Sequence, residues 1–207
     1  MRGEIELWAT GPDPIRMRRT GIWIIGSHKE VKPVCPLWSP CEMKWKLYAK
    51  PKGTRMNTVE DFEDLLVLLN QHGARYLIVG GLAFIFHAKP RFTKDMDLWV
   101  EGCPENLETV NRALADFGSP FLMEINEPDQ VVQLGIAPNR IDLLVEMGPV
   151  SFKEAWPKRV MAPYGRAEAS WIHLDHLEKI KSSIPDPRHQ DDARILRRVR
   201  DRRQSEG

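Results

Sequence analysis

The sequence predicts a mixed α/β (α+β) domain in residues 56–207, with its strands early and its helices late. Three observations predict it. Phe62, Leu65, Leu66 and Leu69 recur at helical spacing, short β-branched and aromatic runs alternate with such helical patterns, and the chain from Leu174 onward is polar, helical in period and broken at "PDP". A small sheet flanked by helices, with a helical C-terminal segment, accommodates all three.

The first predicted helix has Asn57 as its N-cap, with Glu60 three residues on in a capping-box arrangement, and it ends at Gly73. The basic stretch "RRVRDRRQ" near the C-terminus is interpreted as a solvated helix end. The remaining elements are, in order, a strand at 75–79, a turn at Gly80-Gly81, a helix at 82–88, a strand at 96–100, a helix at 105–117, strands at 131–136 and 140–146 that form an antiparallel hairpin, a short helix at "SFKEAW", strands at 159–162 and 167–172, and helices at 174–183 and from 187 onward.

Residues 1–55 differ from the rest of the chain. They carry 11 Lys and Arg against 5 Asp and Glu, a net charge of +6, while residues 56–207 carry 19 against 24, a net charge of −5. Prolines interrupt them and no apolar period appears, so we expect an extension that packs loosely or not at all, and a domain that starts at Met56. The alternative is that four tryptophans dock onto the domain as hydrophobic anchors, for example over a sheet edge: Trp8, Trp23, Trp38 and Trp45.

The whole chain has a formal net charge of only +1, which gives no sign of a surface built to coat nucleic acid. Cys35, Cys41 and Cys103 are an odd number without paired ligand spacing, which favours a reducing cytoplasm over a disulfide framework. No apolar run approaches the roughly 20 residues of a membrane span. The expected location is therefore the cytoplasm, without a membrane partner.

Three carboxylates are the strongest functional signal. Side chains alternate across a strand, so Asp95 and Asp97 share one face, and Asp142 takes the face opposite to Ile141 and Leu143. If the two strands are neighbours, the carboxylates converge, and their repulsion is relieved by a cation. Mg²⁺ takes oxygen ligands and combines carboxylates with substrate phosphates. The pattern predicts a metal site for phosphoryl displacement.

Gly80 and Gly81 strengthen this interpretation. Asp-x-Asp alone is weak and explicable as a solvated strand end, and a glycine pair alone is explicable as a tight turn. Glycines between a strand and a helix also allow a phosphate to approach the backbone, and the N-terminus of the following helix favours an anion. Together with Asp142 the set indicates nucleotide chemistry.

These residues carry a resemblance. The segment "VGGLAFIFHAKPRFTKDMDLWV" resembles the nucleotide-binding segment of minimal nucleotidyltransferases in the DNA-polymerase-beta-like superfamily, and more narrowly that of proteins related to the AbiEii abortive-infection toxins. "RIDLLVEM" with "SFKEAW", and then "LDHLEKIKSSIPDPRHQDDARIL", resemble their later segments, so that the likeness runs from about Asn57 to Val199. The matching residues are Gly80, Gly81, Ala83, Arg91, Thr93, Asp95 and Asp97.

The resemblance implies a nucleotidyltransferase fold, a nucleoside triphosphate substrate, and Mg²⁺ or Mn²⁺ held by Asp95, Asp97 and Asp142. Asp142 would also help to deprotonate the acceptor hydroxyl, and Lys181 would reach the phosphates. Nucleotide binding is implied for Gly80, Gly81, Arg91, Thr93 and Lys181. The chain departs from the family pattern at Ala88, where glycine is frequent. The spacing "RHQDD" also leaves open whether Asp191 or Asp192 takes the family's acidic position, braced against Lys181 or Arg188.

Three functions stay open: a nucleotidyltransferase acting on RNA or protein, a binding protein of the same fold without activity, and an adenylyltransferase that modifies a small antibiotic-like molecule. The resemblance adds a toxin–antitoxin role, tRNA as an acceptor and an antitoxin protein as a partner. The other candidates have ordinary interpretations. His87 is expected to be a satisfied buried histidine, Phe152 and Trp156 core anchors, and three histidines surface residues: His173, His176 and His189.

Overall fold

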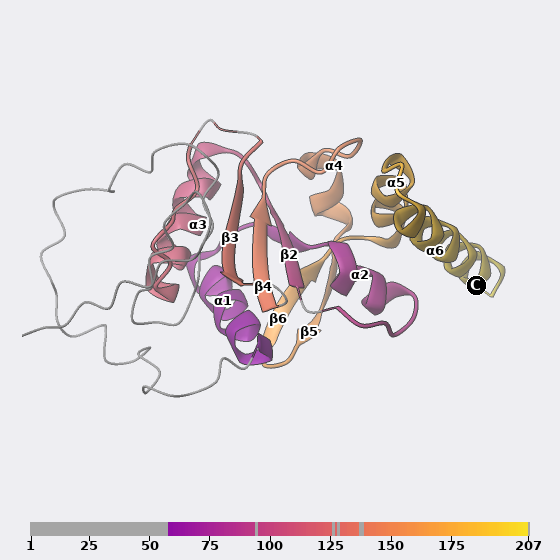
Figure 1. Cartoon of the computed structure of the whole chain (residues 1–207), viewed down its shortest axis with the longest axis horizontal. Helices are drawn as coiled ribbons and strands as arrows, with labels where there is room; N and C mark the ends of the chain where they lie inside the picture. The colour runs from indigo at the N-terminus through magenta and orange to yellow at the C-terminus, as the bar shows by residue number, and fades with distance from the viewer. Residues whose placement is uncertain (1–57, 94, 126, 128, 137–138, 207) are drawn as a thin grey trace, which may run out of the picture.

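The computed structural model describes residues 58–93, 95–125, 127, 129–136 and 139–206 (Figure 1). The expectations for residues 1–55, for a start at Met56 and for Asn57 as an N-cap lie outside the described residues. Within these ranges, no helix is long and apolar enough to cross a membrane.

In the described part of the chain, six strands form one sheet in the order β3-β4-β2-β1-β6-β5. β2 is parallel to β4 and β1 is parallel to β6, while the other three pairs are antiparallel. The predicted mixed α/β class is therefore confirmed, as is the hairpin of β3 with β4. The strands are β1 (Tyr76–Ile78), β2 (Asp95–Val100), β3 (Val131–Ile136), β4 (Asn139–Leu144), β5 (Val160–Tyr164) and β6 (Ala167–Trp171).

Several helices begin or end at residues whose side chain or backbone conformation caps them. Gly118 adopts a left-handed conformation after α3, and Ser151 and Glu154 form a reciprocal capping box at α4. Asp186 caps α6 by accepting from the amides of Arg188 and His189. The helices are α1 (Thr58–His72), α2 (Gly80–His87), α3 (Pro104–Phe117), α4 (Phe152–Ala155) with the 3₁₀ turn η1 (Trp156–Lys158), α5 (Leu174–Ser183) and α6 (Pro187–Ser205).

Figure 1 shows α1 and α3 to the left of the strands, and α5 and α6 together to the right, at the C-terminal end of the fold. His72 of α1 and Asp116 of α3 join the first pair, with Nε2 2.9 Å from Oδ2. α2 lies between the sheet and the C-terminal helices, so it borders both the strand ends and α6.

The core is built from the apolar faces that the sequence predicted. Leu65, Leu66 and Leu69 of α1 are fully buried, and Phe152 is buried with its ring edge-on to Trp99 at 5.2 Å. Trp156 is only partly buried and stacks on Phe152. Phe152 is thus a core anchor, and Trp156 covers it from outside.

The start of α2 differs from the prediction by two residues, within the site. Gly80 and Gly81 are the first turn of α2, whereas the sequence indicated a turn that precedes a helix starting at Leu82. Val79 is the extended residue before the helix. The amide of Gly81 donates to the carboxylate of Asp97, which satisfies one of the free donors of the first turn.

Candidate active site

The pairing of β2 with β4 places three carboxylates and one guanidinium on one face of the sheet. Asp97 stands opposite Asp142, and Asp95 stands opposite Arg140, in a parallel register. Residues in register and residues two apart in a strand face the same way, so all four side chains share that face. Asp142 is buried, with 5% of its surface exposed.

Asp97 lies against the glycine pair. Gly80 has φ of +62°, and a Cβ at this position would collide with Oδ2 of Asp97. Burial raises the pKa of Asp97 to about 6, and the charges of Asp95 and Asp142 add to this, while the Gly81 hydrogen bond and the charge of Lys181 oppose it. The glycines therefore leave room for a carboxylate at the N-terminus of α2.

Asp95 is held by its own loop. The hydroxyl of Thr93 donates to Oδ1 of Asp95 at 2.6 Å. Burial alone would raise the pKa of Asp95, but the hydrogen bonds from Thr93 and from its own amide, with the charges of Arg140 and Arg188, lower it below its ordinary value. Thr93 also lies beside Gly81, whose added Cβ would come within 2.7 Å of the hydroxyl oxygen.

Asp142 is bound through one of its two oxygens. Nε and Nη2 of Arg140 approach Oδ2 at 2.8 and 2.7 Å, whereas Oδ1 is buried and has no hydrogen-bond partner among the described residues. Burial raises the pKa of Asp142, and the charge of Asp95 adds to this. The hydrogen bond and charge of Arg140, and to a smaller extent a hydrogen bond from the Gln133 side chain on β3, oppose the rise. A buried carboxylate oxygen without a partner is a place for a further ligand.

A second cluster, the cationic cluster, consists of Arg91, Lys181 and Asp192. Nη1 of Arg91 donates to Oδ1 and Oδ2 of Asp192 at 2.6 and 2.7 Å, and Nζ of Lys181 lies 3.0 Å from Oδ2. Lys181 and Asp192 are 3% and 4% exposed. The guanidinium of Arg91 also stacks on Phe84 of α2 at 4.4 Å. Two cations thus share one buried carboxylate.

This cluster resolves the ambiguity between the two adjacent acids. Asp192 is the buried partner of Lys181, while Asp191 is exposed and pairs with Arg194. Burial lowers the pKa of Lys181, and the hydrogen bond and charge of Asp192 oppose this. The charge of Arg91 lowers the pKa of Lys181 further, and the charge of Asp97 raises it. The two clusters are therefore close enough for their charges to act on each other.

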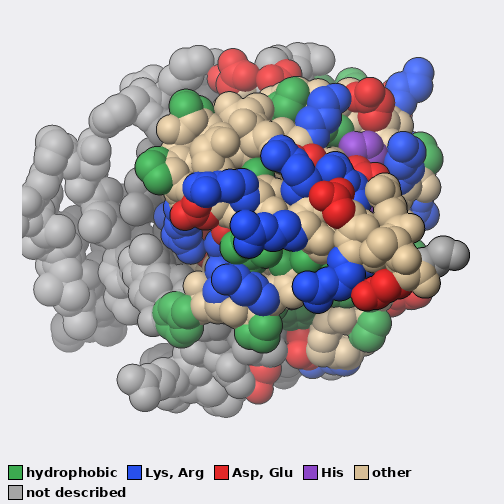
Figure 2. All heavy atoms as spheres, turned by 90° about the vertical axis from the view of Figure 1, so that its right-hand side faces the viewer, with side chains coloured by type: hydrophobic (Ala, Val, Ile, Leu, Met, Phe, Trp, Pro, Cys, Tyr) green, Lys and Arg blue, Asp and Glu red, His purple; other side chains and the backbone are tan. Residues whose placement is uncertain are grey.

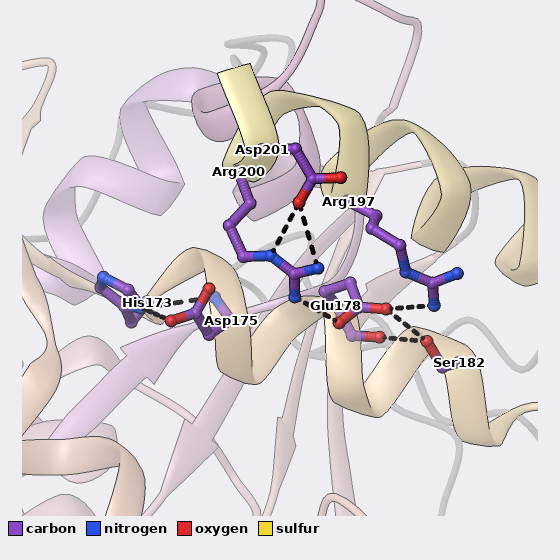
Figure 3. A network of polar contacts seen from close by, with 7 residues as sticks. All are labelled: His173, Asp175, Glu178, Ser182, Arg197, Arg200 and Asp201. Atoms are coloured by element: carbon purple, nitrogen blue, oxygen red, sulfur yellow. Dashed lines mark hydrogen bonds and ion pairs between the residues drawn. The ribbon is translucent and has the colours of Figure 1, made fainter. Parts of the chain in front are cut away.

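The C-terminal basic stretch is mostly exposed, as the sequence predicted, but three of its arginines are also tied to the domain. Arg197 and Arg200 reach Glu178 of α5 at 2.7 and 3.2 Å (Figure 3), and Nη2 of Arg203 donates to the carbonyl of His87 at 3.1 Å. Other basic side chains remain outward, and Figure 2 shows Lys and Arg gathered on this side of the molecule.

Two histidines of the described residues have structural contacts. Nε2 of His87 bonds the carbonyl of Ile172 at 2.6 Å in the core, and burial lowers its pKa. His173 caps α5 by accepting from the amide of Asp175, beside the Glu178 network (Figure 3). His189 lies 3.4 Å from Nζ of Lys181. Among the described residues, no group of three His, Cys, Asp or Glu is arranged as a ready-made metal site.

Sequence reasoning missed Arg140, although the signal was available. Arg140 is two residues before Asp142 in the same strand, and the alternation that placed the aspartate also places the arginine on its face.

No protein-family model matches the chain. No curated protein matches it. Among solved structures, the crystal structure of ANT(2")-Ia in complex with adenylyl-2"-tobramycin is 16% identical with a TM-score of 0.46, over 68% of this chain and 88% of that one. The lincomycin-bound lincosamide antibiotic adenylyltransferase LnuA is 14% identical with a TM-score of 0.47, over 68% of this chain and 96% of that one. These likenesses concern the arrangement of strands and helices.

Proposed function

We propose that the chain is a metal-dependent nucleotidyltransferase, which transfers a nucleoside monophosphate from a nucleoside triphosphate to an acceptor hydroxyl. The observation that carries this proposal is the register of β2 and β4. It sets Asp97 against Asp142, with Asp95 beside them, next to the glycines that open α2. Clustered carboxylates at such a place are suited to a cation that a phosphate chain also binds.

The donor chemistry suits Mg²⁺ or Mn²⁺, since it consists of carboxylate oxygens and the buried Oδ1 of Asp142 lacks a hydrogen-bond partner among the described residues. The carboxylates are not arranged as a metal site in the described residues, so a bound ion would have to draw them together. Asp95 and Asp97 would hold the ion, and Asp142 would share it and accept the proton of the acceptor hydroxyl. The chemistry that a bound ion supplies is neutralisation of triphosphate charge and polarisation of the oxygens that react.

The cationic cluster supports the phosphate half of the proposal. Arg91 and Lys181 bring two positive charges to the single negative charge of Asp192, so the cluster is left with one positive charge in excess, and Nε of Arg91 is buried without a partner among the described residues. A phosphate oxygen would satisfy both deficits. Gly81 and Thr93 border the same place and complete the proposed nucleotide-binding set with Gly80.

The test is transfer itself. The full chain is incubated with each of four α-³²P-labelled nucleoside triphosphates, Mg²⁺ and a bacterial extract separated into RNA, protein and small molecules. We expect one triphosphate to label one fraction, and Asp97→Asn and Asp142→Asn to abolish the label. Asp191→Asn is the matched control, because it removes the same charge at an exposed position. Binding of nucleotide without any labelled product would identify an inactive binding protein instead.

The sequence resemblance extends the proposal to a toxin with an RNA acceptor such as tRNA and a neutralising antitoxin. Induction of the full chain in a bacterial host should then arrest growth, and induction of Asp97→Asn should not. Labelling confined to the small-molecule fraction, with normal growth, would favour an adenylyltransferase of the antibiotic-modifying kind.

A further inference from the structure

Arg140 lies among Asp95, Asp97 and Asp142, which together form the carboxylate cluster. The proposed function gives this arginine no role. It stands in register with Asp95 and two residues before Asp142, on the face that these acids share. Its side chain is 34% exposed, while that of Asp142 is 7% exposed. The guanidinium therefore enters a buried acidic site from its rim.

Arg140 binds Asp142 through one oxygen. The bidentate arrangement of an arginine with a carboxylate sends two parallel N–H groups to the two oxygens. Arg140 instead directs Nε and Nη2 to Oδ2 alone and leaves Oδ1 buried without a partner among the described residues. One oxygen of Asp142 thus remains for a further ligand.

The charges explain why an arginine is there. Asp95, Asp97 and Asp142 act on one another, and the positive charge of Arg140 acts on both Asp95 and Asp142. A divalent cation at the same carboxylates would supply that positive charge and would repel the guanidinium. Arginine and cation therefore compete for the negative charge of Asp142, and each weakens the binding of the other.

We propose that Arg140 is a built-in counter-ion that competes with the divalent cation for Asp142. It is a positioning residue, since it keeps the carboxylates together while no cation is bound, and it sets how tightly the site takes one. This inference rests on the proposed function only in requiring a divalent cation at these carboxylates.

The test measures cation affinity in the absence of nucleotide. Free Mn²⁺ is followed by electron paramagnetic resonance during titration of the full chain at constant ionic strength. Arg140→Gln should bind Mn²⁺ at least about 5-fold more tightly than the unsubstituted protein, because a nearby positive charge and a competitor are both removed. Arg194→Gln is the matched control: it removes the same charge from an exposed arginine on α6 and should leave the affinity within about 1.5-fold.

Arg140→Lys separates competition for Asp142 from a general effect of charge. Lysine keeps the positive charge but is a strongly hydrated point charge without the planar fork. We expect it to tighten Mn²⁺ binding by about 2-fold or more if Arg140 competes for the carboxylate, and not at all if only net charge matters. This variant also decides the question should Arg140→Gln fail to fold in circular dichroism.

Two failures are distinguishable. If the unsubstituted protein binds Mn²⁺, Asp97→Asn abolishes that binding, and both Arg140 variants bind as the unsubstituted protein does or more weakly, then Arg140 is an ordinary structural ion pair and this inference is overturned, while the proposed metal site stands. If neither the unsubstituted protein nor Arg140→Gln binds Mn²⁺, the metal site fails and the inference fails with it.

Discussion

The carboxylate cluster and the cationic cluster lie side by side but are built in opposite ways. Asp95 and Asp142 are held by residues two positions away in the sequence, Thr93 and Arg140. The cationic cluster has no such local contact, because Arg91 and Asp192 are 101 residues apart and Lys181 belongs to the preceding helix α5. In the first cluster the ion pair and hydrogen bond are local in sequence, whereas in the second every contact is between different elements.

The two clusters have opposite net charges, and each has a buried polar atom that lacks a hydrogen-bond partner in the described part of the chain. The carboxylate cluster has three acids for one arginine, and the cationic cluster has two cations for one acid. Each keeps a partnerless buried atom among the described residues, Oδ1 of Asp142 and Nε of Arg91. The comparison teaches that neither cluster is complete alone, and that a ligand with both cations and phosphates would complete both.

The largest expected effect is on activity. Asp97→Asn should lower nucleotide transfer by about 10³-fold or more, because loss of a metal-holding carboxylate removes several kcal/mol of transition-state stabilisation. Incorporation of labelled nucleotide measures it, with circular dichroism to confirm the fold. Transfer at the unsubstituted rate would remove the carboxylate cluster from the chemistry.

The next effect is on stability and falls on the cationic cluster. Asp192→Asn leaves Arg91 and Lys181 buried without an anion and should reduce the free energy of unfolding by about 3–5 kcal/mol. Urea unfolding followed by fluorescence measures it. Asp191→Asn, at the exposed neighbouring position, should change that free energy by less than about 0.5 kcal/mol. Equal effects of the two replacements would mean that burial of the cluster contributes nothing.

A third prediction concerns pH. The pKa of Asp97 is raised from 3.8 to about 6, so the folded state holds this proton more tightly, and the carboxyl's contribution to stability falls as pH rises from about 4 to about 6. The free energy of unfolding of Asp97→Asn should therefore be close to that of the metal-free unsubstituted protein near pH 4. At pH 7.5 it should be larger by about 3 kcal/mol.

Asp95 is the control for this prediction, because its pKa is shifted in the opposite direction. The pKa of Asp95 is lowered, so its contribution to stability is present above the unfolded-state pKa and is lost as pH falls through the folded-state pKa. Asp95→Asn should then destabilise the protein at pH 7.5. Urea unfolding in EDTA from pH 4 to 7.5 measures both, and parallel pH profiles for the two variants would refute the assigned environments.

The smallest effect compares two glycines. Gly80→Ala should lower the free energy of unfolding by about 2 kcal/mol more than Gly73→Ala does. Both positions have positive φ, but only at Gly80 would the new Cβ collide with another side chain, that of Asp97. Thermal and urea unfolding of both variants measure the difference. An equal loss of stability would show that Asp97 moves aside freely.

The local contacts of the carboxylate cluster could be predicted from the sequence, and the contacts between distant segments could not. The period of two places Asp95 and Asp97 on one face of β2, and Asp142 follows once β4 is its neighbour. Arg140 was within reach of the same argument. The contact of Gly80 with Asp97 was not, because no local pattern joins the start of α2 to a side chain of β2.

The choice between Asp191 and Asp192 depended on tertiary packing. Asp192 lies four residues before Leu196, which is fully buried, so both are on the inner face of α6, whereas Asp191 is turned about 100° away. With few apolar residues in this helix, its inner face was hard to identify from the sequence alone. The partners of Asp192 come from a loop and a helix that no local pattern connects.

α6 has contacts along most of its length. Asp192 near its start binds Arg91, Arg197 and Arg200 in its middle bind Glu178, and Arg203 near its end binds the carbonyl of His87 at the end of α2. From Asp192 to Arg203 the helix rises about 16 Å. One helix thus links the Arg91 loop, through Asp192, to the last residue of α2, through Arg203. α2 begins at the glycines beside Asp97, so its two ends border the carboxylate cluster and the end of α6.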